Sequence, residues 1–197
     1  MKIKRPSLKG ENIFTYYRDV RGASLLHFAV ENRDLAGVKF YSSFPGLLNA
    51  KDHAGETALH WCADEGFTEA ASLLLSVGAD VNSTNGRGQT PAIRAFYSDS
   101  SQLLRLLVTD KNFNPEIKDA RLLTVAHHAA ACGSEEQKEI VVSGLCEKGY
   151  FFLIDEEPSV FNPNFLRLYN KKTYRDYRRR EDKRIFDACF ALRKKTK

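Results

Sequence analysis

The sequence lacks the features of secreted, membrane-spanning and disulfide-stapled proteins. No apolar run reaches about 18 residues, the length that a membrane-spanning helix needs. The basic start, Met1 to Pro6, is not followed by an apolar stretch, so we expect no secretory signal peptide. The 197 residues hold four cysteines and no CxxC pair. We therefore expect reduced thiols in an intracellular protein, located in the cytoplasm or the nucleus.

Sequence signatures of catalysis are also missing. There is no GxSxG, GxGxxG or P-loop stretch, and the turn Gly86-Arg87-Gly88 lacks the Lys-Ser/Thr pair that binds phosphate. His60 and Cys62 lie two residues apart on a predicted helix and face different sides, which disfavours a Cys/His nucleophile. The neighbours His127 and His128 point about 100° apart on a helix, and no acidic or cysteine pair completes a tetrahedral metal site. We expect no enzyme, no metal and no cofactor.

Basic charge is in excess at the C-terminal end and not in the rest of the chain taken together. Hydrophobic residues make up 43% of the chain and charged residues 28%, as in a soluble globular protein. The formal net charge is +5, but residues 167–197 alone carry 13 Lys/Arg and 4 Asp/Glu. The remainder of the chain is therefore acidic, with a net charge of −4. The pI of about 9.0 reflects the tail and not the body.

One pattern recurs along the body of the chain. A turn opener is followed by a glycine three residues later in the first three copies, by a hydroxyl residue five residues later, and by a small residue ten residues later. The openers lie 33, 33 and 34 residues apart, at Asp19, Asp52, Asn85 and Asp119. The hydroxyl residues suit helix N-caps and lie at Ser24, Thr57, Thr90 and Thr124. A histidine three residues after the hydroxyl recurs in copies one, two and four. Such repetition favours a structural role over a catalytic one.

These residues resemble the ankyrin repeat. Thr57-Ala58-Leu59-His60-Trp61-Cys62-Ala63, together with Gly78-Ala79-Asp80-Val81-Asn82, follows the family pattern, as do parts of the other copies. The resemblance covers residues 19 to about 149 and implies an all-α solenoid of helix–turn–helix repeats with turn or hairpin loops. We expect an N-terminal cover segment (1–18), four repeats (19–51, 52–84, 85–118 and 119–149) and a divergent C-terminal cap (150–197) with a basic helix.

Three departures from the family pattern predict local differences. Ile93 stands where repeat three should have its histidine, so one side-chain bond to the neighbouring loop is expected to be absent. Leu122 replaces the turn glycine of repeat four, and we expect that turn to be distorted or flattened. The segment from Phe44 to Asn49 rewrites the end of the second helix in repeat one. Terminal repeats are often atypical because one of their faces meets water.

The resemblance implies protein–protein recognition through a concave groove formed by turn tips and the exposed side of each first helix. We expect an adaptor, inhibitor or targeting protein that is monomeric on its own. If the chain comes from a pathogen, delivery into a host cell is the corresponding expectation. The predicted partner-binding residues in this groove are Arg21, Glu31, Asn32, His53, Glu56, Trp61, Asp64, Glu65, Arg87, Gln89, Arg94, Tyr97 and Arg121.

Charge suggests where partners would bind. Residues 52–85 contain six acids and no Lys or Arg, and Glu56, Asp64 and Glu65 fall on predicted groove positions. A basic or mixed-charge partner segment is therefore expected at repeat two, with simple solubility as the alternative explanation.

The basic C-terminal helix offers a second function. Its basic patch comprises Arg175, Arg178, Arg179, Arg180, Lys183 and Arg184. It could bind nucleic acid or an anionic lipid surface, or act as a nuclear localisation signal. Alternatively, Glu181 and Asp182 pair with these residues on a solvated capping helix.

Overall fold

The structure is a computed structural model, and it describes residues 16–98 and 100–148. Within these ranges the chain forms helices and turns and no strand. The helices are α1 (Leu25–Glu31), α2 (Leu35–Tyr41), α3 (Pro45–Leu48), α4 (Ala58–Glu65), α5 (Thr68–Ser76), α6 (Pro91–Tyr97), α7 (Ser101–Thr109), α8 (Val125–Cys132) and α9 (Glu135–Glu147). The all-helical ankyrin fold predicted from the repeat is thereby confirmed.

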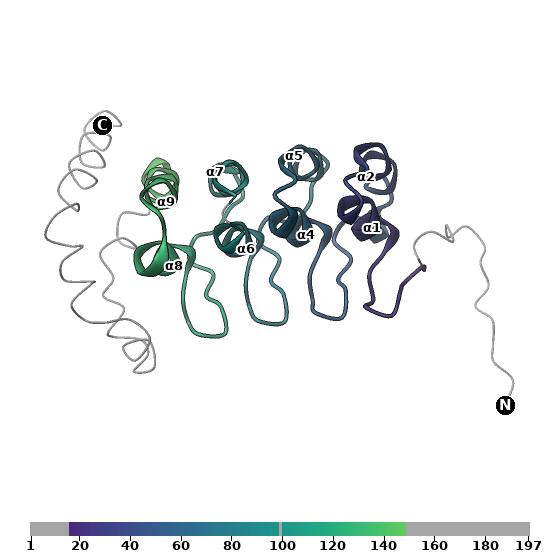
Figure 1. Cartoon of the computed structure of the whole chain (residues 1–197), viewed down its shortest axis with the longest axis horizontal. Helices are drawn as coiled ribbons and strands as arrows, with labels where there is room; N and C mark the ends of the chain where they lie inside the picture. The colour runs from purple at the N-terminus through teal and green to yellow at the C-terminus, as the bar shows by residue number, and fades with distance from the viewer. Residues whose placement is uncertain (1–15, 99, 149–197) are drawn as a thin grey trace, which may run out of the picture.

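The helices form two parallel rows (Figure 1). One row contains the second helices α2, α5, α7 and α9, and the other contains the first helices α1, α4, α6 and α8. The loops that precede the first helices project from the first-helix row, side by side, like fingers. Each first helix therefore contacts its neighbours in the row and its own second helix behind it. The stack leaves the fingers and one side of the first helices facing outward.

The first helices begin where the hydroxyl residues predict. Ser24, Thr57, Thr90 and Thr124 occupy the N-cap positions. In α1, α4 and α8 the histidine three residues later completes a capping box, because its ring bonds back to the N-cap backbone. The same histidines reach the next repeat: His27 Nε2 lies 3.0 Å from the Glu56 carbonyl oxygen, and His60 Nε2 lies 3.0 Å from that of Gln89. Their predicted structural role is confirmed at these two junctions.

The four fingers share one turn geometry. In each, the opener's side-chain oxygen accepts hydrogen bonds from the backbone N–H groups two and four residues later, at 2.7–3.0 Å. The residue three after the opener has a positive φ, as at Gly88 with +72°. Adjacent fingers are joined by backbone bonds, for example from the His53 N–H to the Arg21 carbonyl oxygen at 2.8 Å. The opener and the glycine therefore form one structural unit.

The prediction of a distorted turn at Leu122 is wrong. Leu122 adopts the left-handed conformation of the glycines, with φ +64°, and its N–H donates to the Asp119 carbonyl oxygen at 2.8 Å. Asp119 holds this turn through the same two side-chain bonds that the other openers make. A left-handed Leu costs about 1–2 kcal/mol relative to glycine, because its Cβ crowds the carbonyl oxygen. The turn therefore keeps its shape, and its left-handed Leu122 backbone makes it less stable than a turn with glycine there.

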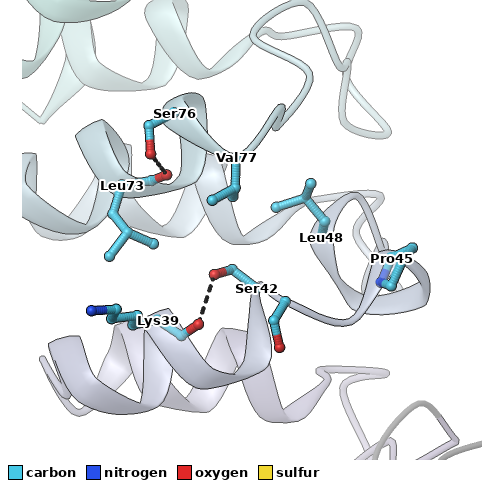
Figure 2. A pocket seen from close by; sticks show the side chains of 8 residues that line it. Lys39, Ser42, Pro45, Leu48, Leu73, Ser76 and Val77 are labelled. Atoms are coloured by element: carbon cyan, nitrogen blue, oxygen red, sulfur yellow. Dashed lines mark hydrogen bonds between the residues drawn. The ribbon is translucent and has the colours of Figure 1, made fainter.

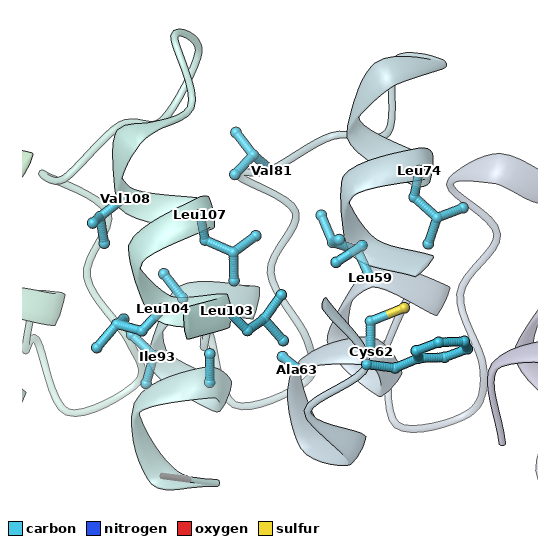
Figure 3. Close-up of a cluster of buried hydrophobic side chains, with 14 of the residues drawn as sticks. Leu59, Cys62, Ala63, Leu74, Val81, Ile93, Leu103, Leu104, Leu107 and Val108 are labelled. Atoms are coloured by element: carbon cyan, nitrogen blue, oxygen red, sulfur yellow. The ribbon is translucent and has the colours of Figure 1, made fainter. Parts of the chain in front are cut away.

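Leucines and alanines fill the space between the two rows (Figure 3). Leu59, Leu74 and Leu103 are at most 1% exposed, and Cys62 lies among them as a buried free thiol. Burial raises the pKa of this thiol far above its ordinary value, so the group stays protonated and inert. Ile93, which replaces a bridging histidine, is fully buried in the same core. An apolar group thus takes the place of a bond between repeats.

Repeat one ends differently from the others, as its sequence predicts. Its second helix stops at Tyr41, and α3 follows with Pro45 in its first turn and Leu47 fully buried. The proposed N-terminal cover lies outside the described residues except for positions 16–18, where Tyr17 packs against Phe28 with ring centroids 6.0 Å apart. Residues 149–197, which include the proposed C-terminal cap, lie outside the described part entirely.

Candidate functional site

The predicted contact residues come together on one surface. We call the finger tips and the exposed sides of α1, α4, α6 and α8 the finger face. Most of these residues are exposed or half-buried. Gln89 is an exception: it is 7% exposed, and its main-chain oxygen accepts the bond from His60. The repeat position of Gln89 is therefore correct, but its side chain belongs to the interior and we remove it from the contact set.

Arg21 organises the first part of the finger face. Its guanidinium donates to both carboxylate oxygens of Glu31 at 3.0 Å and to Asp19 at 2.9 Å. It also lies over the Trp61 ring, 5.0 Å from the centroid, and over the Phe28 ring at 5.6 Å. These contacts order the arginine and leave little of its charge uncompensated.

Trp61 has structural partners as well as a partly open surface. Its indole N–H donates to Asp52 Oδ2 at 3.1 Å, and its ring packs edge-on against His27 with centroids 5.0 Å apart. It is half-buried and packs against the core. Replacing it would therefore disturb the turn and the core together with any partner contact.

The second part of the finger face centres on Arg94 of α6. Its Nε donates to Asp64 Oδ1 at 2.8 Å, and a second bond joins the guanidinium to Asp64 Oδ2. Glu56 lies 3.8 Å away and also accepts from Asn85 Nδ2 at 3.2 Å. The bonds to Asp64 raise the pKa of Arg94 further above its already high value. Burial raises the pKa of Glu56, although Arg94 opposes this shift.

These pairs offset part of the acidic charge of repeat two. Glu56 and Asp64 share the single positive charge of Arg94 from repeat three. Asp52 and Asp80 hold their own turns through side-chain bonds to backbone N–H groups. Of the six acids in residues 52–85, only Glu65 and Glu69 have carboxylates without a hydrogen-bond or ion-pair partner among the described residues. Asp64 and Arg94 are 30 residues apart in the sequence, and the stacking of consecutive repeats brings their opposite charges together. Repeat two therefore keeps an excess of negative charge, and the expectation of a basic or mixed-charge partner segment there stays a prediction.

A buried polar network lies at the third part, where α6 meets α8. Tyr97 Oη lies 2.9 Å from His128 Nδ1, and His128 Nε2 lies 3.0 Å from Asp119 Oδ2. Arg121 donates to the Tyr97 hydroxyl at 2.9 Å and to Asp119 at 3.3 Å. Although burial alone would raise the pKa of Asp119, its bonds to His128 and to backbone N–H groups lower it to about 2. The network fixes the Tyr97 ring at the edge of the finger face.

Sequence reasoning missed His128 as a structural residue, because it tested this histidine only as a metal ligand. A usable signal existed: His128 occupies the same repeat position as Phe28, Trp61 and Arg94, the row that lines the finger face. Aligning that row would have placed it beside the residues of repeat three. Among the described residues no group of three His, Cys, Asp or Glu side chains is placed to bind a metal ion.

The remaining predicted residues are placed as follows. Asn32 Nδ2 donates to the Phe28 carbonyl oxygen at 2.9 Å, and the main-chain oxygen of Glu65 accepts from Arg33. His53 and Arg87 are exposed at finger tips. The basic patch (Arg175, Arg178, Arg179, Arg180, Lys183 and Arg184) lies outside the described residues. Within the described part, no helix has the length and apolar character needed to cross a membrane.

A separate hollow opens on the second-helix side, between α2, α3 and α5 (Figure 2). Its volume is about 640 Å³, and its lining includes Leu48, Leu73 and Val77 with Lys39 at the edge. No predicted contact residue lines it. It lies at the end of repeat one, where α3 follows α2.

Comparisons with known proteins point to one repeat family. Residues 26–119 match the family described as ankyrin repeats in three copies. A crystal structure of an ankyrin repeat domain from Acinetobacter baumannii AYE is similar, with a TM-score of 0.59 and 23% sequence identity, over 64% of this chain and 67% of that one. This likeness concerns the fold.

Curated relatives match parts of the chain. Human protein phosphatase 1 regulatory subunit 27 is 35% identical over 71 residues, which are 36% of this chain and 46% of that protein. Mouse rabankyrin-5 is 34% identical over 79 residues, 40% of this chain and 7% of that protein. An ankyrin repeat protein of Acanthamoeba polyphaga mimivirus is 25% identical over 191 residues, 88% of this chain and 25% of that protein. The chain therefore spans less than half the length of these relatives.

Proposed function

Because the chain belongs to the ankyrin repeat family over residues 26–119, and ankyrin repeats are protein–protein interaction modules, we propose that it binds a partner protein through the finger face without catalysing a reaction. The role would be that of an adaptor, an inhibitor or a targeting protein. That one relative is named as a regulatory subunit of a phosphatase supports a regulatory role of this general kind. Fold alone does not determine a partner, so the surface must.

The observation that carries the proposal is the pre-ordered state of the finger face. Arg21, Arg94 and Tyr97 are each held by side chains from another part of the array. Backbone bonds join consecutive finger tips, as from the Gly86 N–H to the Ala54 carbonyl oxygen at 2.7 Å. A partner would therefore meet side chains whose conformations are already fixed, which lowers the entropy cost of association.

Site-specific photo-crosslinking tests this proposal. The photoreactive residue p-benzoylphenylalanine replaces His53 at a finger tip or, as the matched control, Arg105, which is exposed on α7 in the second-helix row. Both full-length variants are irradiated in a lysate of the cells that express the chain naturally. We expect a discrete protein adduct from position 53 and none from position 105. An adduct from position 105 alone, or the same adducts from both, would contradict finger-face binding.

An intracellular location, in the cytoplasm or the nucleus, belongs to the same proposal. Fluorescence microscopy of the tagged full-length chain tests it, and an exclusively extracellular signal would contradict it. In the same cells, the distribution of a chain with Arg178, Arg179 and Arg180 changed to Gln shows whether the basic patch directs the protein to the nucleus.

A further inference from the structure

Two exposed arginines lie at the third and fourth fingers. Arg21 and Arg94 are bonded to carboxylates, as described above. Arg87 is exposed at the third finger tip and has no carboxylate within 4.0 Å among the described residues. Arg121, on the fourth finger, donates to Asp119 at 3.3 Å, and its side chain remains 46% exposed. The two fingers are adjacent, because the Ala120 N–H donates to the Arg87 carbonyl oxygen at 2.9 Å.

An exposed apolar side chain lies beside these arginines, on the fourth finger. Leu122 is 51% exposed, so its side chain contributes little to the core. Its backbone occupies a conformation that favours glycine, and the other three fingers have glycine at this position. Strained backbone that the fold does not require is typical of binding and switch sites. The leucine side chain therefore fits a contact with another molecule better than a role in stability.

Tyr97 completes the surface. It is 46% exposed, while its hydroxyl is held by His128 and Arg121 at 2.9 Å. A fixed, partly exposed aromatic ring is an effective binding anchor, because little side-chain entropy remains to be lost. Its position ties it to the fourth finger through Arg121.

We propose that Arg87, Tyr97, Arg121 and Leu122, which we call the fourth-finger surface, bind an extended acidic segment of a partner protein. Carboxylates of the segment bond to Arg87 and Arg121, whose forked donors match carboxylate geometry. An apolar side chain of the segment rests on Leu122 and the Tyr97 ring. This inference rests on the proposed function and specifies the chemistry of the partner, through charge complementarity.

Peptide selection tests the inference. A library of random peptides, about 16 residues long and displayed on phage, is selected against the full-length protein, and the dissociation constants of enriched peptides are measured by fluorescence anisotropy. We expect enriched peptides with a net negative charge and at least one aliphatic or aromatic residue. Their affinity should fall at least tenfold for Arg87→Glu and for Leu122→Gly, and should stay unchanged for Arg105→Glu.

The variant Leu122→Gly separates binding from folding. Glycine suits the backbone of this turn, so the variant should unfold at the same or a higher urea concentration than the natural chain while it loses peptide affinity. Enriched peptides that are neutral or basic, or that bind both variants as tightly as the natural chain, would overturn the inference. Peptides whose affinity depends on Glu65→Lys but not on Arg87→Glu would refute it while leaving finger-face binding intact.

Two other occupants give distinct results. The chain carries Asp155-Glu156-Glu157 directly after the apolar residues 150–154. If acidic peptides bind only after these three acids are changed to Lys, the surface serves the chain's own segment and the partner proposal fails. If a single-stranded oligouridylate competes with the peptides at equal concentration, the surface recognises polyanions and the proposal fails as well.

Discussion

Acidification from pH 7 to pH 5 should destabilise the protein by about 2 kcal/mol through His60 alone. The His60 side chain is fully buried, its Nδ1 accepts from the Thr57 N–H at 3.2 Å, and its Nε2 lies 3.0 Å from the Gln89 carbonyl oxygen. These bonds suit the neutral ring, with the proton on Nε2. Burial lowers the pKa of His60 to about 4, against about 6.5 in an unfolded chain.

The sign follows from where the proton binds. Between pH 6.5 and pH 4 the unfolded chain takes up a proton at position 60 that the folded chain does not. The stabilisation is thus fully present above pH 6.5 and is lost as the pH falls, by about 2 kcal/mol at pH 5 and about 3 kcal/mol at pH 4. Glu56 works in the opposite direction, because burial raises its pKa and protonation favours the fold.

Urea unfolding at pH 7, 6 and 5 measures the effect in the natural chain and in His60→Ile. The variant copies repeat three, where Ile93 is fully buried at the equivalent position. His27, whose pKa burial also lowers, is present in both proteins and cancels in the comparison. We expect the natural chain to lose about 2 kcal/mol more than the variant between pH 7 and pH 5. Equal losses in the two proteins would refute the reasoning.

Three further predictions concern stability and reactivity. A double-mutant cycle on Arg94→Ala and Asp64→Ala should give a coupling energy of about 1 kcal/mol, since the pair is half-buried and bidentate; a coupling near zero would show that it is a solvated pair. Leu122→Gly should raise the free energy of unfolding by up to about 1 kcal/mol. Gly55→Ala should lower it, because Gly55 has φ +78° and a Cβ on it would lie 2.8 Å from the Gly86 nitrogen. Urea titrations of both variants check the two signs. Cys62 should resist iodoacetamide in the native protein and react after unfolding, as followed by peptide mass spectrometry; rapid native labelling would contradict its burial.

The repeat itself could be predicted from sequence because its signals are local. Each finger is determined by an opener, a residue with positive φ and an N-cap within six residues of one another, and these contacts form inside the segment. Asp52 and Thr57, for example, hold turn and helix without help from distant residues. Four imperfect copies at one spacing then make the stacking predictable, since each copy buries its apolar side only against another.

The state of the surface residues could not be predicted in the same way. Repeat position indicated that Asp64 and Arg94 face the same side, but not that their side chains bond to each other. Similarly, Gln89 occupies the repeat position of Ala23 and Leu123, which are also buried, but the sequence alone did not separate it from the exposed finger-tip residues. The replacement of the turn glycine by Leu122 predicted a distorted turn, because the sequence does not show the two bonds by which Asp119 holds that turn.

Hydrogen–deuterium exchange of the full-length chain tests the central claim most directly. Exchange is measured for the chain alone and for the chain mixed with the purified partner that photo-crosslinking identifies. If the finger face is the binding surface, exchange slows in peptides that contain the finger tips and the first helices α4, α6 and α8. Exchange in α5 and α7 stays unchanged. Protection confined to the second helices, or to the hollow between α2, α3 and α5, would contradict the account.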